Sequence, residues 1–202
     1  MLILVSTRIA DNASYPERRD ALAHDWGQLF DRYGLVPLLV PNSLADVRPY
    51  LDLGAKGLLL TGGDSLGSKD NPTARDRTEA TLIDGAIHRG MPIFGVCRGL
   101  QMLNRHFGGD SLRLSDQRHV GRHTLQLQDG SSMEVNSFHN DAVTLEGLAP
   151  ALLPFAQAAG GIVEGVRHSS LPITAIQWHP ERRSPSAQYD EFLIKEWMKA
   201  CV

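Results

Sequence analysis

A cysteine between two glycines is the feature of this sequence with the clearest chemical meaning. Gly95-Val96-Cys97-Arg98-Gly99 follows an apolar run of strand length and precedes a segment with apolar residues at helical spacing. A nucleophile between small residues at such a junction occupies a sharp turn that lifts its side chain above the sheet edge. The helix N-terminus then points at the sulfur and stabilises a thiolate. The backbone N–H of Arg98 is expected to face a developing oxyanion.

A second motif bears on whether Cys97 is catalytic, because a free cysteine is also a common core residue and Cys97 alone leaves the two interpretations about even. Gln177-Trp178-His179-Pro180-Glu181 directly follows an apolar stretch, 173–176. His179 at a strand end is placed to act as general base to Cys97, and Glu181 is placed to orient the imidazole. Together the motifs predict a Cys97–His179–Glu181 triad.

Paired glycines mark a third element. Thr61-Gly62-Gly63-Asp64 follows the apolar run 57–60. Glycines let the backbone approach a ligand closely, so this pair is expected to supply a second oxyanion N–H. By itself such a segment is more often an ordinary turn, and the assignment depends on the other two motifs.

The elements that must position these motifs alternate along the first half of the chain. Strands are expected at 2–5, 36–40, 57–60 and 92–96, and helices around 22–33, 44–53 and 82–87. This alternation predicts an α/β fold with a mostly parallel sheet and helices on both faces. Beyond Gly109, short segments at 124–127, 133–136, 152–158, 161–167 and 173–177 predict a small antiparallel extension, and apolar residues at 189–197 predict a final helix. No repeat or linker interrupts the chain, so one domain over 1–202 is expected.

Composition excludes some classes of protein. The 202 residues are 42% hydrophobic and carry a formal net charge of -3, which argues against a protein that coats nucleic acid or an anionic membrane. The apolar start, 1–5, is too short for a signal peptide, and no run reaches membrane-spanning length. The two cysteines, Cys97 and Cys201, cannot form a disulfide framework. These features favour a cytoplasmic protein in which a cysteine can be reactive.

Four motifs in this order resemble the class I (triad) glutamine amidotransferase superfamily and, within it, the peptidase C26-like branch of γ-glutamyl hydrolases. The motifs are Thr61-Gly62-Gly63, the segment 95–101, Asn136-Ser137-Phe138-His139 and the segment 177–181, and the resemblance covers nearly the whole chain. It implies a flavodoxin-like fold, in which Cys97 forms a γ-glutamyl thioester and His179 and Glu181 complete the triad.

The resemblance also implies binding roles. Gly63 and Arg98 would supply the oxyanion N–H groups. Gln101 and the backbone of Ser137 and Phe138 would hold the α-amino and α-carboxylate end of the substrate, with His139 in the same motif. Fixed partners at both ends of a zwitterionic head orient the amide for attack. The implied partner is a small γ-glutamyl compound, and no cofactor is expected.

The leaving group is the part of the substrate on which the sequence says least. The chain departs from γ-glutamyl-GABA hydrolases at 64–70 and at Asn140-Asp141, and segments 21–27, 119–123, 136–140 and 179–182 instead resemble γ-glutamyl-CDP-amidate hydrolases of capsule phosphoramidate synthesis. A nucleotide requires Arg or His donors. Arg122, His123 and Arg182 are predicted to bind it, and Arg8 and Arg75 are also available, although a solvated surface charge is the simpler explanation for each one.

No metal site is predicted. His119 and His123 have the four-residue spacing of a metal pair on a helix, but Gly121 between them argues against a helix there.

Three functions remain compatible with these residues. The first is a stand-alone γ-glutamyl hydrolase, in which water resolves the thioester. The second is a glutaminase subunit that delivers ammonia to a synthase, which requires a partner chain. The third is a non-enzymatic domain on the same fold, which the presence of all three triad residue types disfavours. The hydrolase is the predicted function.

Overall fold

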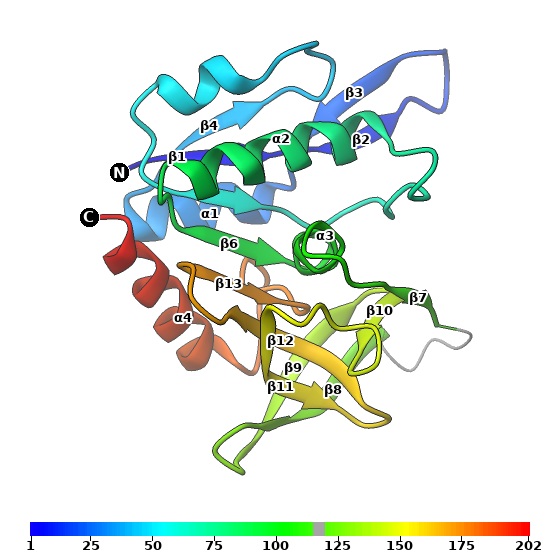
Figure 1. The fold of residues 1–202 in the computed structure, drawn as a ribbon, viewed down its shortest axis with the longest axis vertical. Helices are drawn as coiled ribbons and strands as arrows, with labels where there is room; N and C mark the ends of the chain where they lie inside the picture. The colour runs from blue at the N-terminus through cyan, green and yellow to red at the C-terminus, as the bar shows by residue number, and fades with distance from the viewer. Residues whose placement is uncertain (115–119) are drawn as a thin grey trace.

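The computed structural model describes residues 1–114 and 120–202, and most of its strands lie in one large sheet (Figure 1). The strands of this sheet are β1 (Leu2–Ser6), β4 (Val36–Val40), β5 (Leu58–Leu60), β6 (Ile93–Val96), β7 (Leu112–Arg113), β8 (Val120–Leu127), β9 (Ser132–Phe138), β10 (Asp141–Thr144), β11 (Leu152–Ala158), β12 (Ile162–His168) and β13 (Ile173–Ile176). A separate hairpin consists of β2 (Arg8–Asp11) and β3 (Arg18–Ala21).

The sheet has a parallel half and an antiparallel half. Its order is β4-β1-β5-β6-β13-β12-β11-β8-β9, with β10 paired to β12 and to β7. The pairs from β4 to β13 are parallel. The pairs from β13 onward through β12, β11, β8 and β9 are antiparallel. The α/β architecture with an antiparallel extension that the sequence predicts is therefore confirmed.

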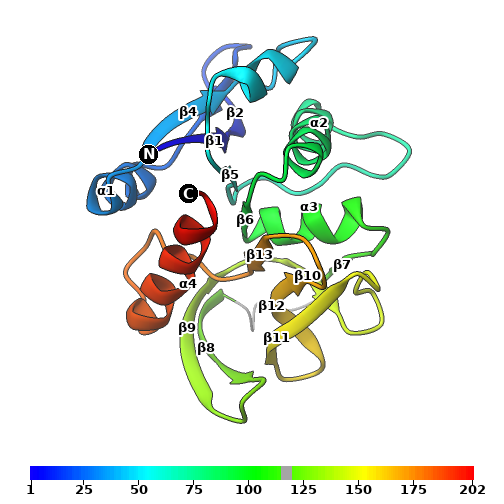
Figure 2. The same ribbon diagram turned by 60° about the vertical axis from the view of Figure 1, so that its left-hand side comes forward.

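Helices cover both faces of the parallel half. Figure 2 shows α1 (His24–Tyr33) and α4 (Ala187–Ala200) on one side, and α2 (Ala74–His88) and α3 (Arg98–His106) on the other. Strand β1 shows why the sheet needs both layers. Its side chains alternate between two apolar clusters: Ile3 and Val5 pack with α1 and α4, and Leu4 packs with α2 and α3. Burial of each such side chain stabilises the fold by roughly 1.5–3 kcal/mol.

The structure differs from the local expectations in three places. The helix expected at 44–53 is reduced to a 3-10 helix, Arg48–Asp52, with Pro49 in its first turn. Proline lacks an N–H and disfavours helical backbone before it, so the helix cannot extend upstream. The β2-β3 hairpin was not expected, because its residues are mostly exposed and lack an apolar alternation. Leu22 also precedes α1, which begins at His24.

Among the described residues, no helix is both long and apolar enough to cross a membrane.

Candidate functional site

Cys97 occupies a strained elbow between β6 and α3. Its backbone has φ 54° and ψ −105°, and no other non-glycine residue in the described part of the chain has a positive φ. Such conformations cost about 1–3 kcal/mol and persist only where the surroundings enforce them. The flanking glycines, Gly95 and Gly99, allow the close packing that holds this turn. A Cβ on Gly99 would lie 2.5 Å from the carbonyl oxygen of Leu60, and one on Gly95 would lie 2.8 Å from Leu103.

His179 and Glu181 lie in the loop that follows β13. The Nδ1 atom of His179 is 2.7 Å from Oε1 of Glu181, and both side chains are buried. Strand β9 fixes the backbone of this loop. Asn136 donates from Nδ2 to the His179 carbonyl at 2.8 Å, and its Oδ1 accepts from the His179 N–H at 2.8 Å. This reciprocal pair holds the imidazole at the junction of the two halves of the sheet.

Gly62 lies against both Cys97 and His179. A Cβ added to Gly62 would lie 2.9 Å from Cε1 of His179 and 3.3 Å from Cβ of Cys97, so only glycine fits between them. Burial acts to lower the pKa of His179, but the adjacent Cys97 and Glu181 outweigh burial and raise it to about 10. The structure thus brings together the three residues of the predicted triad.

Helix α4 anchors the segment just before His179. The indole N–H of Trp178 donates to Oδ1 of Asp190 at 2.6 Å, and the Ser186 hydroxyl donates to both carboxylate oxygens at 3.0 Å. Burial raises the pKa of Asp190 to about 6. The indole and hydroxyl donors satisfy the hydrogen-bonding needs of the buried Asp190 carboxyl. These contacts fix the direction in which the chain leaves β13.

The glycine-rich segment after β5 is held by Arg75 on α2. Arg75 is fully buried and donates to the carbonyl oxygens of Thr61 (2.6 Å) and Gly62 (3.2 Å). It also pairs with Glu79 (2.8 Å) and Asp64 (2.7 Å). Arg75, which the sequence left available for a leaving group, therefore directs its guanidinium at the backbone of this segment.

The side chain of Arg98 joins the same buried network by donating to Glu79 and to Asp76, both on α2. Glu79 thus links Arg98 to Arg75. Burial acts to raise the pKa of Glu79, but the two arginines outweigh it and hold the pKa below its usual value. The backbone N–H of Arg98 lies in the first turn of α3, where no carbonyl of the same helix is available to it. Its role toward an oxyanion, like that of Gly63, stays a prediction.

Two of the residues predicted to bind the glutamyl group are buried beside the start of β10. Gln101 on α3 donates from Nε2 to the carbonyl oxygen of Asp141 at 2.9 Å and to Oε1 of Gln177 at 3.3 Å. Nδ1 of His139 lies 3.0 Å from the same Asp141 oxygen, and its Nε2 lies 3.3 Å from Glu164. Both side chains therefore meet at the Asp141 carbonyl oxygen, and Gln177 links Gln101 to Cys97.

Ser137 and Phe138 form the end of β9, beside the His179 loop. The rings of Phe138 and His179 meet edge to face with centroids 5.7 Å apart, and the guanidinium of Arg182 lies 4.5 Å from the Phe138 centroid. The Phe138 side chain is 47% exposed. The end of β9 therefore lies beside the His179 ring, and the binding role of Ser137 and Phe138 stays a prediction.

A cavity of about 30 Å³ adjoins His179, lined among others by Arg8, Trp26, Gly62, Gly63 and Arg182. This volume holds about one water molecule. The hairpin, the glycine-rich segment and the His179 loop all contribute to its walls. Residues from elements that lie far apart in the sequence therefore line this cavity.

Of the three residues predicted to bind a leaving group, only Arg182 lines this cavity. Arg122 is exposed on β8, with Nη1 3.4 Å from Glu134, and His123 has Nε2 3.4 Å from the buried Glu164. Arg8 lines the cavity as well, and it forms no ion pair within the described part of the chain. His119, which the sequence pairs with His123, lies outside the described residues.

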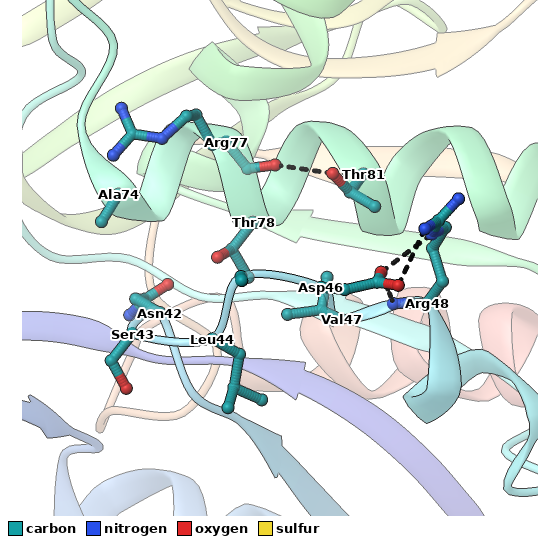
Figure 3. Close-up of a pocket in the computed structure, with 11 residues that line it drawn as sticks. Asn42, Ser43, Leu44, Asp46, Val47, Arg48, Ala74, Arg77, Thr78 and Thr81 are labelled. Carbon is teal, nitrogen blue, oxygen red and sulfur yellow. Dashed lines mark hydrogen bonds and ion pairs between the residues drawn. The ribbon is translucent and has the colours of Figure 1, made fainter.

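A larger cavity, of about 640 Å³, lies elsewhere (Figure 3). The segment after β4 and one side of α2 form it, and Figure 3 shows Asp46 and Arg48 paired at one end. Nε of Arg48 lies 2.8 Å from Oδ1 of Asp46. None of the four sequence motifs contributes to its lining. Across residues 1–114 and 120–202, no group of three or more His, Cys, Asp or Glu side chains could hold a metal ion.

Fold and site together define an α/β protein with a cysteine elbow at the end of one parallel strand and a His–Glu pair at the end of the next. Residues 2–181 match the peptidase C26 family, and the chain belongs to that family. It is 31% identical over 204 residues to the γ-glutamyl-CDP-amidate hydrolase of Campylobacter jejuni, covering 98% of this chain and 97% of that protein. It is 27% identical over 212 residues to the γ-glutamyl-γ-aminobutyrate hydrolase of Escherichia coli O157:H7, covering 83% of this chain and 81% of that protein.

Solved structures show the same fold. A glutamine amidotransferase from Thermotoga maritima superposes with a TM-score of 0.67 at 17% identity, covering 98% of this chain and 84% of that one. The resemblance that the four motifs carry is thereby confirmed, as is the flavodoxin-like glutamine amidotransferase fold. Family membership supports a hydrolase of the γ-glutamyl type.

Proposed function

We propose that this chain hydrolyses a γ-glutamyl amide bond and uses Cys97 to form a γ-glutamyl thioester. The observation that supports this most directly is the convergence of a strained cysteine elbow with the buried His179–Glu181 pair at Gly62. Nucleophile, base and orienting carboxylate in this relation are the arrangement that covalent acyl transfer requires.

The reaction proceeds in two halves. The sulfur of Cys97 attacks the amide carbonyl carbon, and the C–N bond breaks as the protonated His179 gives its proton to the leaving nitrogen. Water then attacks the thioester and gives a proton to His179, and the C–S bond breaks to restore the thiolate. We assign the oxyanion N–H groups to Gly63 and Arg98. Arg75 supports this segment by donating to the carbonyl of the preceding Gly62, and Glu79 supports Arg98 by accepting from its side chain.

For the other part of the substrate, we propose a leaving group that carries phosphate, with a γ-glutamyl-CDP-amidate as the specific candidate. Arg8 and Arg182 support it, because both are cations that line the cavity beside His179. Arginine forms strong charge-assisted hydrogen bonds to phosphate oxygens. The relative from Campylobacter jejuni, which spans nearly the whole chain, is named for hydrolysis of such a compound.

The test is a panel of γ-glutamyl compounds assayed for glutamate release: glutamine, γ-glutamyl-GABA and a γ-glutamyl nucleotide amidate. We expect release from the purified chain alone, with the highest kcat/KM for the nucleotide conjugate. Release from none of them would contradict the hydrolase. Glutamine turnover that appears only when cell extract is added would favour the alternative, a glutaminase subunit that supplies ammonia to a synthase partner.

A further inference from the structure

Gln177, the residue between β13 and the His179 loop, directs its side chain at the sulfur of Cys97. Gln177 is fully buried, and its Nε2 lies 3.5 Å from Sγ of Cys97. Sulfur accepts hydrogen bonds weakly when it is a thiol and more strongly when it carries charge. The sequence motif contains Gln177, but no role follows for it from the sequence alone.

The orientation of the Gln177 amide follows from a chain of hydrogen bonds. Gln101 Nε2 lies 2.9 Å from the carbonyl oxygen of Asp141, and a carbonyl only accepts, so the nitrogen of Gln101 must face it. The same nitrogen lies 3.3 Å from Oε1 of Gln177. Inverting the Gln177 amide would set two NH₂ groups against each other and an oxygen against the sulfur. The network therefore requires an N–H of Gln177 toward Cys97.

We propose that Gln177 is a further catalytic residue, whose side-chain N–H stabilises the Cys97 thiolate, and that Gln101 is a positioning residue that orients it. This inference rests on the proposed function, in which Cys97 is the nucleophile. Gln177 contacts the attacking atom, whereas Gly63 and Arg98 are assigned to the substrate oxygen. Its role also differs from that of His179, which lies beside Cys97 at Gly62 and is assigned the proton transfers.

The same hydrogen bond serves both halves of the reaction. Before attack it favours the thiolate over the thiol. When the thioester forms, the charge leaves the sulfur and the hydrogen bond weakens. When water resolves the thioester, charge returns to the departing sulfur, and the Gln177 N–H stabilises it again. Loss of the donor therefore lowers kcat and leaves substrate binding nearly unchanged.

The direct test is Gln177→Met in a Cys201→Ser background, with Gln157→Met as a matched control on β11, away from the site. The ultraviolet absorbance of the thiolate, measured across pH as a difference from the Cys97→Ser protein, reports Cys97 without any substrate. We expect its pH midpoint to rise by about 0.5–1 unit in Gln177→Met, a change of roughly three- to tenfold, and to stay fixed in Gln157→Met. An unmoved midpoint in a folded Gln177→Met protein overturns the proposal.

A second variant covers the case in which Gln177→Met does not fold, as judged by circular dichroism. Gln101→Met retains Gln177 and removes the group that orients it, so the midpoint should shift in the same direction by a smaller amount. An unmoved midpoint in that variant overturns the proposal as well. Failure of every γ-glutamyl compound to release glutamate would contradict the proposed function and leave this thiolate measurement intact, so the two failures are distinguishable.

Discussion

The two halves of the sheet hold their functional side chains in different ways. In the parallel half, the ends of β5 and β6 carry the glycine-rich segment and Cys97, and buried charges on α2 fix both from behind. In the antiparallel half, β9 presents Phe138 and β8 presents Arg122, and both side chains are exposed. Strand β13 belongs to both halves, since it is parallel to β6 and antiparallel to β12, and His179 follows it.

We infer that this difference separates the groups that would perform the proposed reaction from those that would select the substrate. Around Cys97 the packing leaves no room for a larger side chain, since a Cβ on Gly99 would lie only 2.5 Å from the Leu60 oxygen. Exposed side chains, by contrast, can be substituted without disturbing the core. We therefore expect changes at Cys97 and the buried groups behind it to lower turnover of every substrate, and changes at Arg8 and Arg182, which line the cavity beside His179, to alter only which substrate is accepted.

The strongest test of this division is Cys97→Ser. Glutamate release should fall by on the order of 10³-fold or more for every γ-glutamyl substrate, because a hydroxyl at the elbow is a far weaker nucleophile than a thiolate. The fold should persist, since the side chains have similar size. Cys201→Ser is the control: Cys201 packs at the end of α4, where burial raises its pKa to about 11, and its loss should leave kcat unchanged. Inactivation by the Cys201 change alone would refute the assignment.

The second test concerns His179 and Glu181, in the loop that follows β13. His179→Ala should cost about as much as Cys97→Ser, and Glu181→Gln should cost roughly a hundredfold less, as an orienting carboxylate does. The raised pKa of His179, about 10, keeps its ring protonated at neutral pH in the folded protein. Proton donation by His179, and with it kcat, should therefore persist through neutral pH and decline only as the pH rises toward that value. A pH–rate profile of each variant checks this, and wild-type turnover by His179→Ala would exclude the triad.

These two tests concern residues that the sequence identifies without help, and the reason is local. Glycines two residues either side of Cys97, and a histidine two residues before Glu181, are constraints imposed within a few residues of the chain. The parallel strands that present them are buried on both faces, so their apolar runs are plain in the sequence. That is why the fold class and the convergence of the triad residues follow from the sequence.

The groups that the sequence misses depend on distant parts of the chain. From the sequence, Arg75 is most simply a surface charge, and its contact with Thr61 depends on the packing of α2. Its partner Glu79 belongs to none of the sequence motifs. Gln177 gains a role only when Gln101 is placed beside it. The approach of Arg8 to the cavity depends on the β2-β3 hairpin, whose exposed residues have no apolar pattern. Hydrogen-bond partners set by packing have no signature in local sequence.

Arg75 is the next test in size, because it is the buried charge that fixes the glycine-rich segment. Arg75→Met should lower the free energy of unfolding by about 3–5 kcal/mol, since it leaves Glu79 buried without one of its partners. It should also lower kcat more than it raises KM. The matched control is Arg48→Ala, which removes the exposed pair with Asp46 and should change stability by less than about 1 kcal/mol. Chemical denaturation of both variants gives the comparison, and equal small losses would show that the network is not structural.

The smallest expected effect concerns the cavity beside His179 and the leaving group. Arg8→Ala and Arg182→Ala should each lower kcat/KM for a nucleotide conjugate by about one power of ten, because a charge-assisted hydrogen bond to phosphate is worth roughly 1.5–3 kcal/mol and both side chains are partly solvated. Glutamine, which carries no phosphate, should be affected little. Added salt should weaken binding of the nucleotide substrate selectively, since both cations are partly solvated.

Arg122→Ala decides between the geometry and the sequence-based assignment. Arg122 pairs with Glu134 on the neighbouring strand and lies outside the cavity lining, so its loss should leave both substrates unchanged. If Arg122→Ala lowers nucleotide turnover as much as Arg182→Ala does, the leaving group extends over β8, and the antiparallel half binds substrate directly. If Arg8→Ala and Arg182→Ala reduce turnover of glutamine and of the nucleotide equally, these arginines support the His179 loop rather than a phosphate. A phosphate-bearing leaving group would then lose the observation that supports it, and a generic γ-glutamyl amide hydrolase would remain.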